Sequence, residues 1–150
     1  MKIVIALILI GINTIQNGYD LIAIRTAYVA AATHKSGLLH LKKILAAAPA
    51  DPLINCYRGA AEMIEAKYAL NPLNKLSAFD KGKQLIEQAI AADSDNVECR
   101  FIRYGIQRNL PAVLSYHSHL KNDSTLINNR LDTITDQDLK KRIINFIKRG

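Results

Sequence analysis

The sequence predicts an all-α protein of about six to eight helices, arranged as stacked antiparallel hairpins in a single domain over residues 19–150. Apolar residues after position 19 recur at helical spacing almost throughout, and no stretch alternates with a period of two. Aromatic residues make up only 6% of the chain, whereas alanine, leucine and isoleucine abound, which favours helices packed closely through small side chains. Connections are short, so neighbouring helices are expected to run antiparallel and bury their apolar stripes together.

Residues 1–18 have the layout of a secretory signal peptide. Lys2 precedes an apolar run from Ile3 to Ile10, which is too short to span a bilayer, since a spanning helix needs about 20 residues. No A-x-A cleavage motif follows the run, and the alternative interpretation is an uncleaved strand or helix in the core. We expect an exported protein, periplasmic or extracellular, with no transmembrane segment once the signal peptide is removed.

Eight helices follow from the apolar periodicity and from the helix start and stop residues. They are expected at residues 20–33, 38–48, 51–70, 77–92, 95–108, 112–120, 124–131 and 136–148. Residues 35–37 are expected to form a turn and residues 71–76 a polar loop. Ser77 and Asp80 then resemble a capping box, and Thr135 is the expected N-cap of the last helix.

Residues 82–96, GKQLIEQAIAADSDN, resemble the second helix and exit turn of a tetratricopeptide repeat. That motif has Ala-x3-Phe-x2-Ala-x4-Pro where this chain has Gly82, Ile86, Ala89 and Ser94. The preceding helix lacks the family's Trp-x2-Leu-Gly-x2-Tyr pattern. The whole chain, with its RFIRYGIQRNLP stretch, also resembles a group of uncharacterised exported helical proteins of Bacteroidetes. The repeat resemblance covers about one tenth of the chain and implies a tetratricopeptide-like scaffold that binds a peptide or protein in a groove.

A cluster of polar side chains on the helices at 51–70 and 95–108 is the candidate binding site. If the hairpins stack, these two helices are equivalent and lie side by side on the groove face. Arginine forks recognise carboxylates or phosphates bidentately, so the cluster predicts a groove for an acidic peptide or a C-terminal carboxylate. The candidate groove residues are Arg58, Glu62, Arg100, Arg103, Tyr104 and Gln107. The alternative is structural: Glu62 or Glu65 pairs with these arginines and fixes the register of the helices.

No residue pattern identifies an enzyme. His117 and His119 diverge by about 200° on a helix, and a zinc site would need two more ligands, so we expect both at the surface. Ser115 and Ser118 lie near them in no nucleophile motif, and the chain has no phosphate-binding or dinucleotide-binding glycine pattern. We expect no catalytic residue, cofactor or metal ion, and a hydrolase-type or metal site of unrecognised pattern is the remaining alternative.

The net charge of +7 at pH 7 favours an anionic partner, but the basic residues are spread over several predicted helices. The preferred function is therefore a non-enzymatic exported module that binds a protein or peptide, with an acidic partner favoured and no nucleic acid expected. A second function is an accessory subunit that docks on a partner or a membrane through the basic amphipathic helix at 136–148; otherwise this helix caps the stack. Both a Cys56–Cys99 disulfide and two buried free thiols remain open. The oligomeric state does not follow from the sequence.

Overall fold

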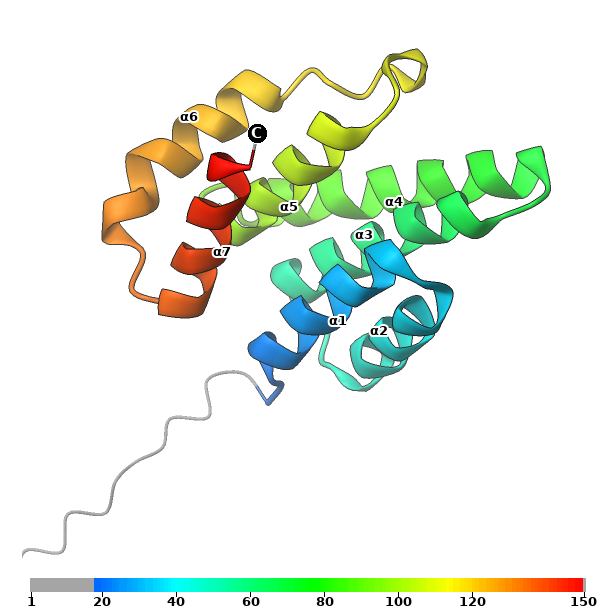
Figure 1. The fold of residues 1–150 in the computed structure, drawn as a ribbon, viewed down its shortest axis with the longest axis horizontal. Helices are drawn as coiled ribbons and strands as arrows, with labels where there is room; N and C mark the ends of the chain where they lie inside the picture. The colour runs from blue at the N-terminus through cyan, green and yellow to red at the C-terminus, as the bar shows by residue number, and fades with distance from the viewer. Residues whose placement is uncertain (1–17, 150) are drawn as a thin grey trace, which may run out of the picture.

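The computed structural model describes residues 18–149, and every regular element in that range is a helix (Figure 1). The α-helices are α1 (Leu21–Thr33), α2 (Lys35–Ala47), α3 (Pro52–Tyr68), α4 (Pro72–Ala92), α5 (Val97–Asn109), α6 (Leu120–Arg130) and α7 (Gln137–Lys148), with the 3-10 turns η1 (Ala112–Leu114) and η2 (Leu131–Thr133). These seven α-helices confirm the predicted all-α class. The predicted signal peptide, except Gly18, lies outside the described residues. Within the described range, no helix combines the length and the apolar character that a membrane span requires.

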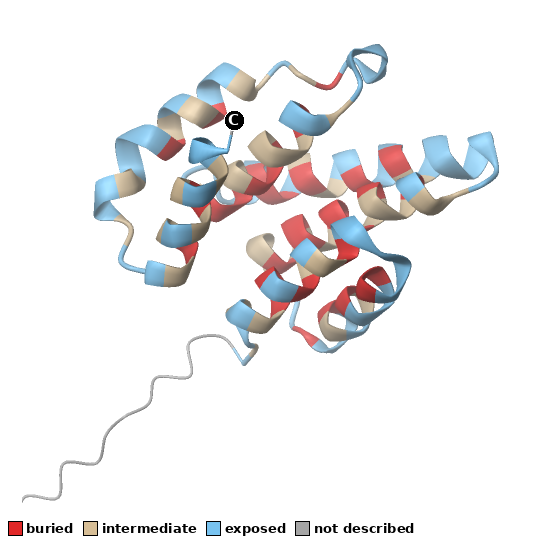
Figure 2. Cartoon of the chain, viewed as in Figure 1, coloured by how far each residue is buried: buried red, intermediate tan, exposed pale blue. Residues whose placement is uncertain are grey.

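Helix α3 is the central element of the fold. It packs against α1, α2, α4 and α5, and its buried face includes Ile54, Tyr57 and Ala60. The main apolar core collects the inward faces of these five helices, which Figure 2 shows as red bands turned toward one another. Helices α2 and α4 both pack against α3, so a surface between α2 and α4 has α3 beneath it.

Glycines bring two pairs of helices into backbone contact. A Cβ atom at Gly82 would lie 2.6 Å from the carbonyl oxygen of Gly59, and one at Gly59 would lie 2.7 Å from that of Gly82. Helices α3 and α4 therefore meet where neither has a side chain. Gly37 has the same role in α2, where a Cβ atom would lie 2.5 Å from the carbonyl carbon of Ala30. The tetratricopeptide-like regularity of the hairpins stays a prediction.

The predicted turn at 35–37 and the predicted loop at 71–76 are wrong, because residues 35–37 and 72–76 are helical. The extended backbone of His34 separates α1 from α2, and α2 begins at the next residue. Helix α4 begins at Pro72, since the Asn71 side chain accepts the backbone N–H of Leu73 at 2.8 Å and proline suits the first helical position. Asn71-Pro72 therefore starts α4, whereas α3 has already ended at Tyr68 with Ala69 as its C-cap.

Because α4 begins so early, Ser77 and Asp80 lie within it and form no capping box. Asp136, and not Thr135, is the N-cap of the last helix, where its carboxylate accepts the N–H of Leu139 at 3.0 Å. The helix predicted at 112–120 is reduced to η1, which ends at Ser115 in a left-handed backbone conformation. Helix α6 correspondingly starts at Leu120, earlier than predicted.

The α5–α7 end of the molecule has a second, smaller apolar cluster. Its buried members are Ile127 of α6 with Leu139 and Ile143 of α7. The Phe146 ring of α7 meets Phe101 and Tyr104 of α5 edge-on, with centroid distances of 5.4 and 6.0 Å. Leu139, Ile143 and Phe146 of α7 thus face the rest of the molecule, and whether α7 also docks on a partner stays a prediction.

Candidate functional site

The two candidate arginines of α5, Arg100 and Arg103, form hydrogen bonds and ion pairs within the protein. Arg103 is only 2% exposed, and it donates to both carboxylate oxygens of Asp123 on α6 at 2.7 Å and to Glu87 on α4 at 2.7 Å. Arg100 donates to Asp123 at 3.0 Å and to the carbonyl oxygen of Ser94 at 2.9 Å. Burial would lower the pKa of the Arg103 guanidinium, but the hydrogen bonds with Asp123 and the negative charges of Asp123 and Glu87 together raise it. Both arginines therefore hold α6 against α5.

The two other candidate residues on α5 are also structural. Gln107 is fully buried, and its side-chain oxygen accepts the backbone N–H of His119 at 3.2 Å. Tyr104 packs its ring against Phe146 of α7. The Gln107 contact anchors the segment between η1 and α6, and the Tyr104 contact anchors the last helix.

The candidate residues of α3 point to different surroundings. Arg58 donates to the carbonyl oxygens of Leu45 and Ala48, both at 2.9 Å, and so satisfies carbonyl groups at the end of α2. Glu62 accepts a hydrogen bond from Lys81 of α4 at 2.9 Å and lies 3.9 Å from Lys42 of α2. The structure therefore does not gather the six candidate residues into one groove.

The predicted pairing of Glu62 or Glu65 with the α5 arginines is wrong. Glu65 forms an ion pair with Lys42 of α2, and Glu62 pairs with lysines on both sides of α3. The partners of the arginines come from α4 and α6 instead. The sequence does not show which carboxylate along the chain is brought to which arginine.

An open groove of about 770 Å³ lies between α2 and α4, over α3. Its lining consists of Lys35, Leu38, Leu39 and Lys42 of α2, Glu62, Glu65 and Tyr68 of α3 with the following Ala69, and Asn74, Ser77, Ala78 and Lys81 of α4. The residues from α2 and from α4 are spaced by three, four and seven positions, which places each set on a single helix face. Of the six predicted site residues, Glu62 alone is among those that line this groove.

The charges in the groove are arranged across it. Lys42 pairs with both glutamates of the floor, and Lys81 pairs with Glu62 from the opposite wall. Lys35 lines the groove with no ion pair among the described residues. Ion pairs thus connect both walls to the floor and leave Lys35 as a cation able to meet a ligand carboxylate.

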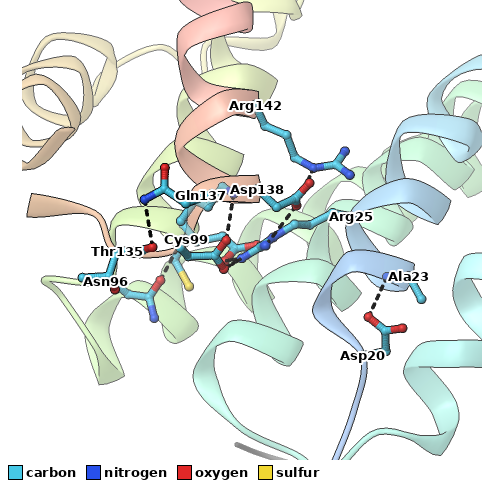
Figure 3. A network of polar contacts seen from close by, with 12 residues as sticks. Asp20, Ala23, Arg25, Asn96, Cys99, Thr135, Gln137, Asp138 and Arg142 are labelled. Carbon is cyan, nitrogen blue, oxygen red and sulfur yellow. Dashed lines mark hydrogen bonds and ion pairs between the residues drawn. The ribbon is translucent and has the colours of Figure 1, made fainter. Parts of the chain in front are cut away.

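A buried ion network joins the first helix to the last (Figure 3). Arg25 of α1 donates to both carboxylate oxygens of Glu98 at 2.7 Å, to Asp136 at 2.8 Å and to Asp138 at 3.1 Å. Tyr57 donates its hydroxyl to the same Glu98 at 2.6 Å. Burial would lower the pKa of Arg25, but hydrogen bonds with Glu98 and Asp136 outweigh burial and raise it.

Sequence reasoning missed this network, although one feature indicates it. Arg25 is the only charged residue in LIAIRTAYVAAAT, where it shares a face with apolar residues, and such a residue needs a buried partner. Asn96 is the N-cap of α5, and Glu98 in the first turn of that helix is buried against Arg25. The partners from α7 follow only from the tertiary fold.

Cys56 and Cys99 are free, buried thiols on α3 and α5. The Cys56 thiol donates to the carbonyl oxygen of Cys99 at 3.7 Å. Its interaction with the Cys99 side chain and its burial both raise the pKa of Cys56, so its reactive thiolate form is disfavoured.

The two histidines considered as metal ligands, His117 and His119, contact different groups. A ring nitrogen of His117 lies 3.1 Å from the carbonyl oxygen of Leu110, and His119 lies 3.9 Å from Glu87. No group of three or more His, Cys, Asp or Glu side chains within residues 18–149 is arranged to hold a metal ion.

Comparison of the chain with protein-family models, with curated proteins and with solved structures gives no match.

Proposed function

We propose that the protein is a non-enzymatic, exported module that binds a peptide or an extended segment of another protein between α2 and α4. The observation that carries the proposal is the open groove to which α2 and α4 each contribute one continuous face and α3 contributes the floor. Its volume of about 770 Å³ lies within the range of sites that hold small molecules and short peptide segments. Helical-hairpin scaffolds use concave surfaces of this kind for binding.

The lining suits a peptide with an apolar residue beside an acidic one. Leu39, Tyr68 and Ala69 supply apolar surface, and Lys35 lies on the same wall as Leu39. Lys42 and Lys81 are already held in place by Glu62, so the polar part of the groove is ordered before a ligand arrives. The preference for an acidic partner therefore rests on lysines of the groove and not on the α5 arginines.

Export is the part of the proposal that rests on the sequence of residues 1–18. It is tested by the intact mass of the protein recovered from periplasmic and extracellular fractions of its native host. A mass that lacks about 17 to 20 N-terminal residues supports export, and a full-length cytosolic protein contradicts it.

Groove binding is tested by selecting peptides from a random library on the immobilised protein and measuring their affinities by calorimetry. The exposed groove residue Ser77 is replaced in Ser77→Arg, which fills the groove without altering the core. We expect Ser77→Arg and Leu39→Glu to weaken binding by about tenfold or more. Val113→Glu is the control for Leu39→Glu, because Val113 is also exposed but lies on η1 and does not line the groove.

Two results contradict the proposal. One is the absence of any enriched peptide. The other is a set of selected peptides that bind Ser77→Arg and Leu39→Glu as tightly as they bind the unaltered protein.

A further inference from the structure

The connection between α3 and α4 carries an apolar surface that no part of the protein covers. All eight residues from 70 to 77 are exposed, as the pale end of this hairpin in Figure 2 shows. Three of them are leucines: Leu70 is 100% exposed, Leu73 75% and Leu76 54%. Single exposed leucines are common, but three within seven residues are a concentration of exposed apolar surface that is typical of interaction sites.

The three leucines lie at the end of a projecting hairpin, and residues 70–77 at this end form the α3–α4 apex. Figure 1 shows the connection between α3 and α4 at one extreme of the long axis, beyond α1 and α2. Leu73 and Leu76 are three residues apart and share one face of α4. Asn74, Ser77 and Ala78 line the groove from an adjoining face of the same helix. The leucines therefore lie beside the proposed peptide groove, because Leu73 and Ser77 are four residues apart on α4.

These leucines are not needed to form the helix that carries them. Asn71 caps α4 through the N–H of Leu73, and Pro72 occupies the first helical position. The Lys75 N–H then donates to the carbonyl oxygen of Asn71 at 3.0 Å, so the first turn is closed by local interactions. Since local sequence specifies the helix start, the exposed leucines are not needed to form the helix and are accessible to an external contact.

The charges around the apex are of one sign. Between Glu65 and Asp80 the chain contains Lys67 and Lys75 and no acidic residue. Lys67 lies in the last turn of α3 and Lys75 in the first turns of α4, so both flank the leucines. Neither lysine forms an ion pair among the described residues, and Lys67 donates to the carbonyl oxygen of Ala32 at 2.8 Å, so its charge is not balanced by a carboxylate. An apolar centre flanked by cations complements a surface with an apolar interior and anionic groups at its edge.

We infer that the α3–α4 apex inserts shallowly into the interface of an anionic lipid bilayer. The leucines enter the boundary between headgroups and acyl chains, and Lys67 and Lys75 remain among the anionic headgroups. A bilayer accepts a convex apex without a shaped pocket, which suits a hairpin end better than a rigid protein surface does. A second copy of the chain is disfavoured, because apex-to-apex contact would bring lysines of like charge together.

Insertion is tested first with a fluorescent reporter. The chain has no tryptophan, so Leu73→Trp introduces a single emission signal at the apex. With vesicles of phosphatidylcholine containing about 30 mol% phosphatidylglycerol, we expect a blue shift of the emission. Val113→Trp, at a position 85% exposed on η1, is the control and should show no shift. Equal shifts for both variants, or none for Leu73→Trp, would overturn the inference.

Co-sedimentation with the same vesicles separates the contribution of the leucines from that of charge. We expect Leu70→Ser/Leu73→Ser/Leu76→Ser to reduce the bound fraction about tenfold, and the unaltered protein to bind pure phosphatidylcholine weakly. Lys67→Gln/Lys75→Gln should reduce binding and its salt dependence, whereas Lys140→Gln/Lys141→Gln on α7 removes equal charge without effect. Retention of binding by the leucine variant contradicts insertion. Loss of a selected peptide ligand by that variant, with vesicle binding intact, would show a protein contact at the apex and would also contradict it.

Discussion

The two ends of the molecule are held together in different ways. Helices α1 to α4 pack through apolar and very small side chains, with backbone contact at Gly59, Gly82 and Gly37. Helices α6 and α7 join the rest through a small apolar cluster and through ion pairs centred on Arg25 and Arg103. Small residues at regular spacing are visible in a sequence, whereas ion pairs between distant helices are not. Sequence patterns therefore predict the packing of α1 to α4 better than they predict how α6 and α7 are attached.

The largest effect is expected where the α5–α6 ion pair is broken. Asp123→Ala removes the carboxylate that receives two hydrogen bonds from the buried Arg103, and it should lower the free energy of unfolding by about 3–5 kcal/mol. Urea denaturation measures the change. Asp80→Ala, at an exposed position of α4, is the control and should have little effect. Equal losses in both variants would mean that the pair does not hold α6 in place.

The packing of the other end is tested by adding one methyl group. A Cβ atom at Gly82 would overlap the Gly59 carbonyl oxygen, so Gly82→Ala should destabilise the protein by about 1–3 kcal/mol. At Gly105 of α5, the nearest atom to an added Cβ lies 3.7 Å away on Phe146, so Gly105→Ala should stabilise the helix by about 0.5–1 kcal/mol. Changes of opposite sign in thermal or urea unfolding are expected. If Gly82→Ala is neutral, α3 and α4 do not meet as closely as described.

Acid titration examines the network that joins α1 to α7. Burial opposes ionisation of Asp136, but hydrogen bonds from Arg25 and from the Leu139 N–H lower its pKa. The pKa of Asp138 is lowered mainly by its hydrogen bond with Arg142 and further by Arg25. Carboxylates whose folded pKa lies below the unfolded value of about 3.9 stabilise the protein above that pH, and the contribution is lost as the pH falls through the lowered values.

Asp136→Asn/Asp138→Asn should therefore be less stable than the unaltered protein near neutral pH, with a flatter loss of stability below about pH 4. Urea unfolding at a series of pH values gives both profiles. Parallel profiles would show that these carboxylates do not contribute through Arg25.

The smallest effect is expected at the cysteines, which lie where the two ends meet. Burial and the contact with Cys99 disfavour the Cys56 thiolate, so the native protein under reducing conditions should react slowly with a thiol reagent. Because both thiols belong to one apolar core, we expect them to become reactive together, at a rate set by global unfolding. Faster labelling of Cys99 than of Cys56, read by mass spectrometry of peptides, would instead show that the α5–α7 end opens separately.

The sequence predicts the fold class and most helices because apolar periodicity is a local property. The errors at 35–37 and 71–76 arise because the breaks between these helices are very short. His34 alone separates α1 from α2, and only residues 69–71 separate α3 from α4, so a break does not imply a loop. The sequence shows that Arg100 and Arg103 lie on one helix face, and this pattern suggested a binding site. It does not show that both arginines pair with Asp123, because that pairing depends on where α6 packs. The groove depends on α2 and α4 flanking α3, which local patterns do not specify.

We propose that ligands bind between α2 and α4 and not along the arginines of α5. Amide hydrogen exchange of the protein with and without a selected peptide distinguishes these two locations. We expect added protection at the groove residues of α2 and α4, around Leu39 and Ser77, with α5 unchanged. Protection concentrated around Arg100 and Arg103, with α2 and α4 unaffected, would contradict it.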